Sequence, residues 1–418
     1  MKPRASLLSD APTFRQTLAS FPQTVVALLF FTLLTRFSYF MAWPFLSIIL
    51  TRSYHLTPMM IGGVMSGCAL VAVALGIYGG SLSDRWGRKQ ILALGCLLAM
   101  VGYAAIGLAE NVMLFAAGLL LTGISFSWTD APSRALMSDL LVDRRRRELA
   151  LQIRYFAVNI AAVGGPLTGI LFGLNSQKGT FLLTALSYAP FLLFALFALP
   201  AGKNHADPAA GQATAQPGAW QITGVILRDG IYLVALLCSI FCYLIYAQIE
   251  SVVPQYLLML DADSAVDLVT VILVTNAVSV LTVQLWLVPL LSATALGKRI
   301  IIGAWIFAAS QLLFWANSTT SPYWWGMVTV VFSVAEAILL PNLSILLDRL
   351  APERYRGAYL GASSLVVLGL SLGPFVGGTL LEWRGADVFI AMALLSLSIV
   401  LMMLMTKKEM NGRIGQNG

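Results

Sequence analysis

The chain has 418 residues, of which 58% are hydrophobic and only 11% charged, whereas soluble domains carry about 25% charged residues. This composition excludes an ordinary soluble protein and predicts an all-α membrane protein. The apolar residues come in blocks of about 20, the length that a helix needs to cross the hydrocarbon of a lipid bilayer. The net charge of +7 does not indicate a nucleic-acid partner, because the basic residues fall in short gaps between these blocks.

The apolar blocks predict twelve transmembrane helices, six on each side of a linker. The first six spans cover residues 20–50, 57–80, 90–109, 112–141, 149–173 and 179–200. The second six cover residues 229–260, 266–291, 298–316, 322–348, 357–382 and 386–406. Residues 201–228 are rich in Ala, Gly, Pro and Gln and are predicted to be a cytoplasmic linker. The N-terminal half is therefore placed at 1–200 and the C-terminal half at 229–418.

The basic residues predict the orientation of the chain. Most of the 26 Lys and Arg fall on the side of the N-terminus, whereas Arg52, Lys178 and Arg384 fall on the other side. The positive-inside rule then predicts that both termini are cytoplasmic. The run from Arg144 to Arg147 either anchors this topology or contacts anionic lipids.

Three pairs of residues indicate that the two halves are repeats. Pro132 and Pro341, Asp139 and Asp348, and Pro166 and Pro374 are each 208 or 209 positions apart. Such repeats are typical of secondary transporters, in which the substrate binds between the two halves. A substrate path between the halves is therefore expected.

The loop after the second span carries the most specific motif, Gly80-Ser-Leu-Ser-Asp84-Arg85-Trp-Gly87-Arg88-Lys89. An aspartate at a helix C-terminus meets an unfavourable dipole, so Asp84 needs cationic partners, which Arg85, Arg88 and Lys89 can supply. The loop resembles the signature loop of the major facilitator superfamily. The resemblance implies a fold of two pseudo-symmetric six-helix halves. It also implies a cytoplasmic gate in which Asp84 lies near the start of span eleven, and Asp139 could complete its charge network.

A second motif concerns the direction of transport. Gly164-Gly165-Pro166-Leu-Thr-Gly169 in span five resembles the glycine–proline motif of drug:proton antiporters. The region from Gln255 through Gln284 is similar to a subgroup that exports multiple drugs or dipeptides. These resemblances imply efflux, although Gly165, Pro166 and Gly169 are also common packing devices in membrane helices. The chain departs from many proton antiporters in having no arginine among residues 119–123.

Four ionisable residues inside the spans are candidates for substrate binding or proton coupling, because a charge at the bilayer centre costs about 2.5–3.5 kcal/mol on insertion scales. They are Arg36, Asp130, Glu250 and Glu336. Glu336 has apolar neighbours in span ten, so it is expected to exchange protons near neutral pH and is the predicted proton carrier. Arg36 either holds an anionic group of the substrate or forms a buried ion pair with a carboxylate.

Two arginines close to Asp130 have simpler interpretations. Arg134 is four positions after Asp130 on one helical face, so the two could pair with each other. Arg154 in span five is predicted to project away from the substrate path and to reach the cytoplasmic headgroups.

Polar residues in spans five, seven and eight extend the candidate site. Tyr246 and Glu250 form an aromatic and acidic face that suits a cationic ligand or an outer gate, or lies near the water interface. A stripe in span five is expected to face the path, and its members are Gln152, Tyr155 and Asn159. Asn276 and Gln284 in span eight either line the same path or make hydrogen bonds between helices.

The sequence therefore predicts a monomeric, proton-driven exporter of small molecules such as drugs or peptides, which works by alternating access in a bacterial inner membrane. The proton gradient supplies the energy, and no cofactor or metal is expected. An importer, or a dedicated exporter of one metabolite such as a peptide or siderophore, is the alternative. An enzyme is not expected, because the two histidines, His55 and His205, lie in an outer loop and in the linker without a nucleophile motif. A receptor that has lost transport is a further alternative.

Overall fold

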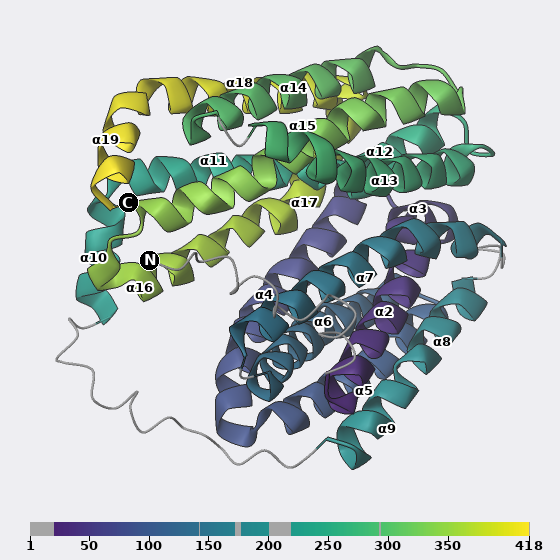
Figure 1. The fold of residues 1–418 in the computed structure, drawn as a ribbon. Helices are drawn as coiled ribbons and strands as arrows, with labels where there is room; N and C mark the ends of the chain where they lie inside the picture. The colour runs from purple at the N-terminus through teal and green to yellow at the C-terminus, as the bar shows by residue number, and fades with distance from the viewer. Residues whose placement is uncertain (1–20, 142, 172–176, 200–218, 292–293, 418) are drawn as a thin grey trace, which may run out of the picture.

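The fold is that of a computed structural model, which describes residues 21–141, 143–171, 177–199, 219–291 and 294–417. Within these ranges every regular element is an α-helix or a 3-10 helix (Figure 1). A helix satisfies its backbone hydrogen bonds internally, which is what the bilayer core demands of a spanning segment. Eleven helices in the described ranges are long and apolar enough to cross a membrane. The chain is thus an all-α, multi-pass membrane protein.

The described helices follow the predicted spans closely. The first half contains α2 (Gln23–Ala42), η2 (Trp43–Phe45), α3 (Leu46–Tyr54), α4 (Pro58–Trp86), α5 (Arg88–Gly107), α6 (Val112–Leu140), α7 (Arg144–Leu171), α8 (Gln177–Ser187) and α9 (Ala189–Phe197). The second half contains α11 (Gly230–Tyr246), α12 (Gln248–Leu260), α13 (Ala265–Leu291), α14 (Leu296–Ala316), α15 (Pro322–Leu350), η4 (Glu353–Tyr355), α16 (Arg356–Ser363), η5 (Ser364–Val366), α17 (Val367–Arg384) and α18 (Asp387–Met405).

Helix α7 is the predicted fifth span, and it is the one predicted span that is missing from the eleven apolar helices of the described ranges. Its first turn is the run from Arg144 to Arg147, and it carries Arg154 and Asn159 further along. These polar residues lower its mean hydropathy, yet the helix packs along α2 as a spanning helix would. The twelve-helix fold predicted from the sequence therefore includes α7.

Two helices occur where none was predicted. Helix α10 (Ala219–Arg228) lies in the segment predicted as linker, and the rest of that segment up to residue 218 falls outside the described residues. Helix α19 (Lys407–Asn417) continues the chain after the last span. Both are short, and α19 carries charged residues instead of an apolar stretch, so a search for membrane-length blocks does not find them.

Two separate hydrophobic cores organise the described helices. One core consists of buried residues between Phe21 and Leu199, and the other of buried residues between Tyr232 and Met410. Phe45 and Ile48 are exceptions, because they belong to the first half in sequence but pack into the core of the second. Each half is therefore built around its own core, and the end of the first span joins them.

The halves meet at one end of the molecule and diverge toward the other (Figure 1). At the end near α3 and α12, here called the closed end, the Met59 backbone N–H donates to Glu382 Oε2 at 2.9 Å. The Arg52 guanidinium donates to the Ala262 carbonyl at the same end. The opposite end, here called the open end, carries α9, α10, α16 and α19.

Glycines let the halves touch at the closed end, where α4 crosses α17. A Cβ atom on Gly62 would run into the carbonyl of Pro374, and one on Gly378 would run into the carbonyl of Pro58. Close by, the backbone N–H of Phe375 donates to Ser66 Oγ at 3.0 Å. Since neither glycine position has room for another carbon, this contact requires glycine on both helices.

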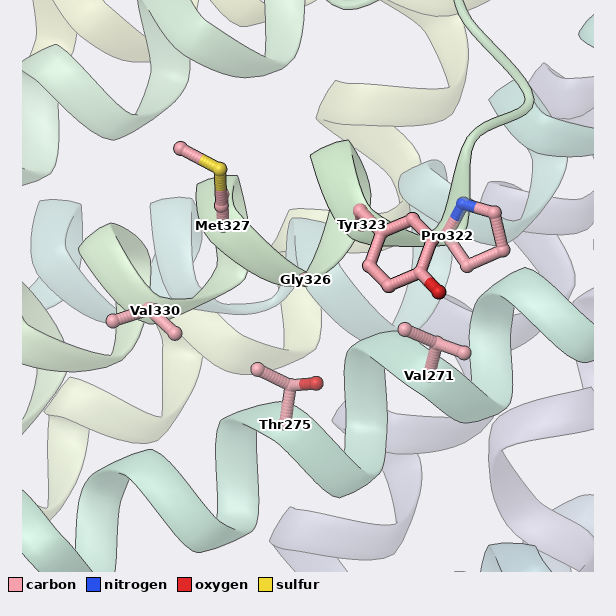
Figure 2. Close-up of a pocket in the computed structure, with 7 residues that line it drawn as sticks. All are labelled: Val271, Thr275, Pro322, Tyr323, Gly326, Met327 and Val330. Atoms are coloured by element: carbon pink, nitrogen blue, oxygen red, sulfur yellow. The ribbon is translucent and has the colours of Figure 1, made fainter.

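An apolar groove of about 480 Å³ lies on the second half, between α13 and α15 (Figure 2). Its lining residues are Val271, Thr275, Pro322, Tyr323, Gly326, Met327 and Val330. Tyr323 is 85% exposed and Met327 is 61% exposed. The groove has no charged residue in its lining and includes none of the predicted site residues.

Candidate functional site

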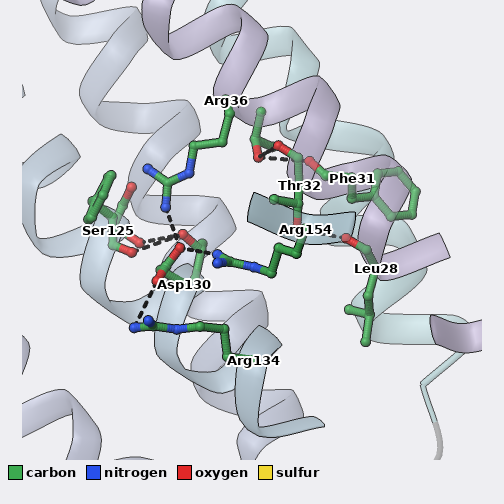
Figure 3. A network of polar contacts seen from close by, with 11 residues as sticks. Leu28, Phe31, Thr32, Arg36, Ser125, Asp130, Arg134 and Arg154 are labelled. Carbon is green, nitrogen blue, oxygen red and sulfur yellow. Dashed lines mark hydrogen bonds and ion pairs between the residues drawn. The ribbon is translucent and has the colours of Figure 1, made fainter. Parts of the chain in front are cut away.

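Four charged residues meet inside the first half and are here called the arginine cluster: Arg36 on α2, Asp130 and Arg134 on α6, and Arg154 on α7 (Figure 3). Arg36 and Arg154 both form ion pairs with Asp130. Arg134 Nη2 lies 3.0 Å from the second oxygen of Asp130. The side chains of Arg36, Asp130 and Arg154 are each only 12% exposed. Three helices therefore bring three guanidinium groups to one carboxylate.

The cluster shows which ion pairs its members form. The expected pair of Asp130 with Arg134 is present, and Arg36 takes part in the buried ion pair that was one of its two alternatives. The prediction that Arg154 reaches the headgroups is wrong, because its guanidinium turns inward to Asp130. The carboxylate offers a nearby counter-charge, so the arginine is stabilised without extending along the helix to water.

Aromatic side chains and a small cavity surround the cluster. The Arg36 guanidinium carbon lies 3.9 Å from the ring centroid of Phe126, a cation–π contact. The cavity, of about 20 Å³, is lined by Thr32, Thr35, Arg36, Phe126, Thr129, Asp130, Ser133, Arg154, Tyr188 and Phe191. Among these residues, Ser133 Oγ and Arg154 Nε are buried and have no hydrogen-bond partner.

Two carboxylic acids stand in the facing half. Glu336 on α15 is 9% exposed and accepts a hydrogen bond of 2.7 Å from Asn276 Nδ2 on α13. The same amide nitrogen donates to Ser333 Oγ at 3.0 Å. The side chain of Trp43 in η2 lies close to the carboxylate of Glu250 on α12. In the described part of the chain neither glutamate forms an ion pair with a lysine or arginine, which sets them apart from Asp130.

Two tyrosines interact electrostatically with the glutamates, and one of them also interacts with Arg36. Tyr39 on α2 lies near enough to Arg36 and to Glu250 to interact electrostatically with both. Tyr246 on α11 interacts in the same way with Glu250 and Glu336, and its ring stacks on Phe332 with centroids 6.3 Å apart. The basic group of the first half and the acidic group of the second therefore belong to one central region.

The polar stripe of α7 lies where the two halves face each other. Tyr155 Oη donates to Gln284 Oε1 on α13 at 2.8 Å, and Asn159 Nδ2 donates to the Tyr155 carbonyl at 2.8 Å. Gln152 is exposed. Within the stripe, Tyr155 thus contacts the opposite half, whereas Asn276 of α13 donates to Glu336. Both span-eight residues make interhelical hydrogen bonds, and a role for the stripe in substrate binding remains a prediction.

The loop between α4 and α5 lies at the open end. Gly87 has a φ of 100°, a conformation that favours glycine and lets α5 start immediately after α4. Arg88 forms an ion pair with Asp139, and Lys89 Nζ donates to the Leu199 carbonyl at 2.8 Å. The structure describes the helix backbone at Gly80, Asp84 and Arg85 but not their side chains, so the predicted contacts of this part of the motif lie outside what is described. The expected link from this loop to Asp139 is therefore present through Arg88.

The glycine–proline motif packs α7 on α2. A Cβ atom on Gly165 would lie 2.7 Å from Phe40 Cβ and 2.9 Å from the Met41 nitrogen. Pro166 and Gly169 are buried in the same helix. The second half repeats the contact, since a Cβ atom on Gly373 of α17 would collide with Ala247 between α11 and α12. The packing interpretation of the motif is therefore correct, and its connection to export remains a prediction.

Sequence reasoning missed three members of the central region. Tyr39 and Trp43 lie one and two turns after Arg36, and this helical spacing could have placed them beside it. Ser133 gave no signal, because a serine in a membrane helix is ordinary. Within the described residues, no group of three or more His, Cys, Asp or Glu could hold a metal ion.

Comparisons of sequence place these features in a family. The model of a family described as Major Facilitator Superfamily matches residues 28–367. The uncharacterized MFS-type transporter YqjV of Bacillus subtilis (strain 168) is 27% identical over 359 residues, which are 85% of each chain. The Na(+), Li(+), K(+)/H(+) antiporter of Planococcus maritimus is 27% identical over 78% of this chain and 82% of its own. Multidrug resistance protein MdtH of Enterobacter sp. (strain 638) is 25% identical over 84% of each chain.

Solved structures agree on the fold. A POT family transporter in complex with 5-aminolevulinic acid superposes with a TM-score of 0.77 over 93% of this chain and 97% of its own, at 16% identity. The nucleoside transporter NupG superposes with a TM-score of 0.70 over 93% of this chain and 100% of its own, also at 16% identity. The family and these relatives are transporters and not enzymes.

Proposed function

The chain belongs to the Major Facilitator Superfamily, and we propose that it is a secondary active transporter that exports small molecules in exchange for protons. The substrates in this proposal are drugs or peptides, and the membrane is the inner membrane of a bacterium. The proton gradient is the energy source, no cofactor takes part, and the monomer is the working unit. One observation carries the proposal, namely that Glu250 and Glu336 lie inside the second half without a basic partner among the described residues.

The chemistry follows from the cost of charge inside a membrane. An ionised carboxylate without a cation partner is expensive there, whereas a protonated carboxyl is neutral and is accommodated. Among the described residues, only the amide of Asn276 donates a hydrogen bond to Glu336, so Glu336 can lose its proton when water or a cationic group reaches it. Proton and substrate then compete for the same carboxylates, which is the requirement for exchange.

Alternating access supplies the two sides of the exchange. The proposal assigns the open end to the cytoplasm and the closed end to the outside, in agreement with the positive-inside rule. In the state described, the glycine crossing of α4 and α17 closes the outer side. In the opposite state, the loop of Gly80, Asp84, Arg85, Gly87, Arg88 and Lys89, with Asp139, would hold the cytoplasmic side shut.

The relatives support the proposal at the level of their names. One is an antiporter that exchanges cations for protons, and another is a multidrug resistance protein. The resemblance of Gly165, Pro166 and Gly169 to an antiporter motif favours export as the direction. A role in substrate binding for Gln152, Tyr155, Asn159 and Tyr246 is part of the same proposal.

Transport by inside-out vesicles tests the proposal. Vesicles with an acidic lumen are loaded with a pH-sensitive dye, and lipophilic cations, dipeptides and siderophores are added in turn. Wild-type protein is expected to release protons when a substrate enters. Glu336→Gln cannot give up a proton and is expected to lose gradient-driven transport while it keeps substrate–substrate exchange. Glu110→Gln is the matched control, because Glu110 is exposed in the loop before α6.

The outcomes separate the alternatives. Proton release by several unrelated compounds supports a polyspecific exporter, and release by one class alone supports a dedicated one. Gradient-driven transport by Glu336→Gln at the wild-type rate would remove Glu336 from the mechanism. Correctly folded protein that responds to no compound in the panel would contradict proton-coupled export and favour an importer.

A further inference from the structure

The arginine cluster carries more positive charge than its carboxylate neutralises. Arg36, Arg134 and Arg154 surround Asp130, and no second carboxylate forms an ion pair with these arginines in the described part of the chain. Guanidinium groups stay charged in proteins, so the cluster has two positive charges in excess. Arg134 is 53% exposed and meets solvent, so one excess charge remains on the buried pair of arginines. Arg36 and Arg154 are nearly buried, so bulk water screens their charge only weakly. The centre of the first half is thus a site of positive potential.

The cluster also holds hydrogen-bond donors that are not used. Arg154 Nε and Ser133 Oγ are buried without partners, and Ser133 is 2% exposed. A buried donor without a partner lowers the free energy of unfolding by about 1–3 kcal/mol, so such atoms are rare in the interiors of folded proteins. Both residues line the same cavity beside Arg36. The unused donors therefore share one cavity with the excess charge.

The cavity has room for a single oxygen atom. Its volume of about 20 Å³ matches the space that one water molecule occupies. A water molecule would satisfy the donors but would leave the excess charge uncompensated. An anionic oxygen would do both, because charge-assisted hydrogen bonds from guanidinium and hydroxyl groups are the strong ones.

We propose that this cavity is an anion subsite which receives a carboxylate oxygen of the substrate, so that the preferred substrates carry both a carboxylate and an amine. The inference rests on the proposed transport function and narrows its substrate class. The amine would meet Glu250 and Glu336, which form no ion pair with a lysine or arginine among the described residues, and Tyr39 interacts electrostatically with both Arg36 and Glu250. Amino-acid-like compounds and short peptides have both charges. An inorganic anion shares the chemistry of the carboxylate and is the competing occupant.

Binding to the wild-type chain in nanodiscs tests the subsite without any substitution. Intrinsic fluorescence of the ten tryptophans reports affinity and thermal stability. The probes are three dipeptides with apolar, aromatic and cationic first residues, each compared with its C-terminal amide and its N-acetyl form, and chloride and acetate alone. We expect the free dipeptide to bind about tenfold or more tightly than its amide, the size of one charge-assisted hydrogen bond. Acetate is expected to compete with the dipeptide.

A pair of serine variants locates the effect. Ser133→Ala removes an unused donor, and the advantage of the free dipeptide over its amide is expected to fall at least threefold. Ser125→Ala is the control, because Ser125 is a buried serine of the same helix that does not line the cavity. If Ser133→Ala does not fold, the wild-type series alone decides.

Three results would overturn the inference. Equal affinity for every dipeptide and its amide would show that the protein does not recognise the carboxylate. Stabilisation by chloride, with no further gain from any peptide carboxylate, would assign the cavity to a free inorganic anion. An unchanged preference in Ser133→Ala would place the carboxylate elsewhere. A preference for the free dipeptide without proton release in vesicles would keep the subsite and contradict only the proposed proton coupling.

Discussion

Arg36 on α2 and Arg154 on α7 donate to the same oxygen of Asp130, Oδ1. One carboxylate therefore ties together three helices of the first half, since Asp130 itself belongs to α6. The two arginines are 118 positions apart in sequence. The pairing is thus a tertiary contact that organises the interior of the half.

Removal of the shared carboxylate is expected to destabilise the first half. Asp130→Asn leaves three guanidinium groups without a counter-ion, and breaking a buried ion pair costs about 3–5 kcal/mol. Thermal unfolding in detergent should show the loss as a clear drop in the midpoint temperature. Asp263→Asn is the control, because Asp263 is exposed in the loop after α12. Equal midpoints for Asp130→Asn and wild type would show that the cluster contributes no stability.

A methyl group at the helix crossing is expected to disfavour the state described here. Gly62→Ala places a carbon against the Pro374 carbonyl, and overpacking costs about 1–3 kcal/mol, which shifts a two-state ratio by about tenfold. Spin labels across the closed end should then report a larger share of long distances. Gly67→Ala is the matched control on the same helix, since nothing lies within 4 Å of its Cβ position. A distance distribution identical to wild type would contradict the tight crossing.

The docking of α19 is expected to depend on pH through Asp229. Burial works to raise the pKa of this carboxyl, but hydrogen bonds from Arg413, Tyr359 and the Tyr232 backbone N–H outweigh it and lower the pKa. Nη1 of Arg413 donates to Asp229 Oδ1 and Nη2 donates to Asp229 Oδ2, each at 2.7 Å. The pKa of Asp229 in the folded chain is below the ordinary value of about 3.9. The stabilising contribution of Asp229 to the docking of α19 is therefore complete above about pH 3.9 and is lost as the pH falls through the folded pKa.

Hydrogen exchange of α19 measures this dependence. Protection in Lys407–Asn417 should persist at neutral pH and fall below about pH 4. Arg413→Gln is expected to expose α19 at neutral pH and to remove the acid transition. Lys408→Gln changes an exposed charge on the same helix and should behave as wild type. Full protection in Arg413→Gln would show that apolar contacts alone hold α19.

The hydrogen bond between Tyr155 and Gln284 is expected to contribute little by itself. Hydrogen bonds between membrane helices average about 0.6 kcal/mol, so Tyr155→Phe should change transport rates by about threefold or less. Tyr155→Ala removes the ring as well and tests whether the exposed ring touches substrate. A loss of tenfold or more in Tyr155→Phe, with the same protein level, would mean that the hydroxyl itself contacts the substrate.

Helix positions could be predicted from the sequence because they depend on local composition. Blocks of apolar residues and the Gly and Pro positions placed the spans to within a few residues, including the end of α15 near Leu350. The pair of Asp130 with Arg134 was also predictable, because it lies within one helix. Both follow from distances along the chain that helix geometry fixes.

The remainder of the site depends on how helices rotate against each other. Arg154 was misplaced because its partner Asp130 lies 24 positions away on another helix. The sequence left open whether Asn276 lines the substrate path or makes a hydrogen bond to a neighbouring helix. Only the packing of α13 on α15 brings it to Glu336. The unused donors of Ser133 and Arg154 likewise appear only when three helices are assembled. Side-chain pairing across helices is not encoded in the spacing of any one of them.

The two hydrophobic cores form one after the other as the chain is synthesised. The first core is made of residues up to Leu199, so it is complete before the second half has left the ribosome. The second core contains Phe45 and Ile48 from the first span, and it cannot close until the earlier half is present to supply them. The second half therefore needs side chains of the first half to complete its interior. A variant that lacks the first span would lack part of the core that its last six helices pack around.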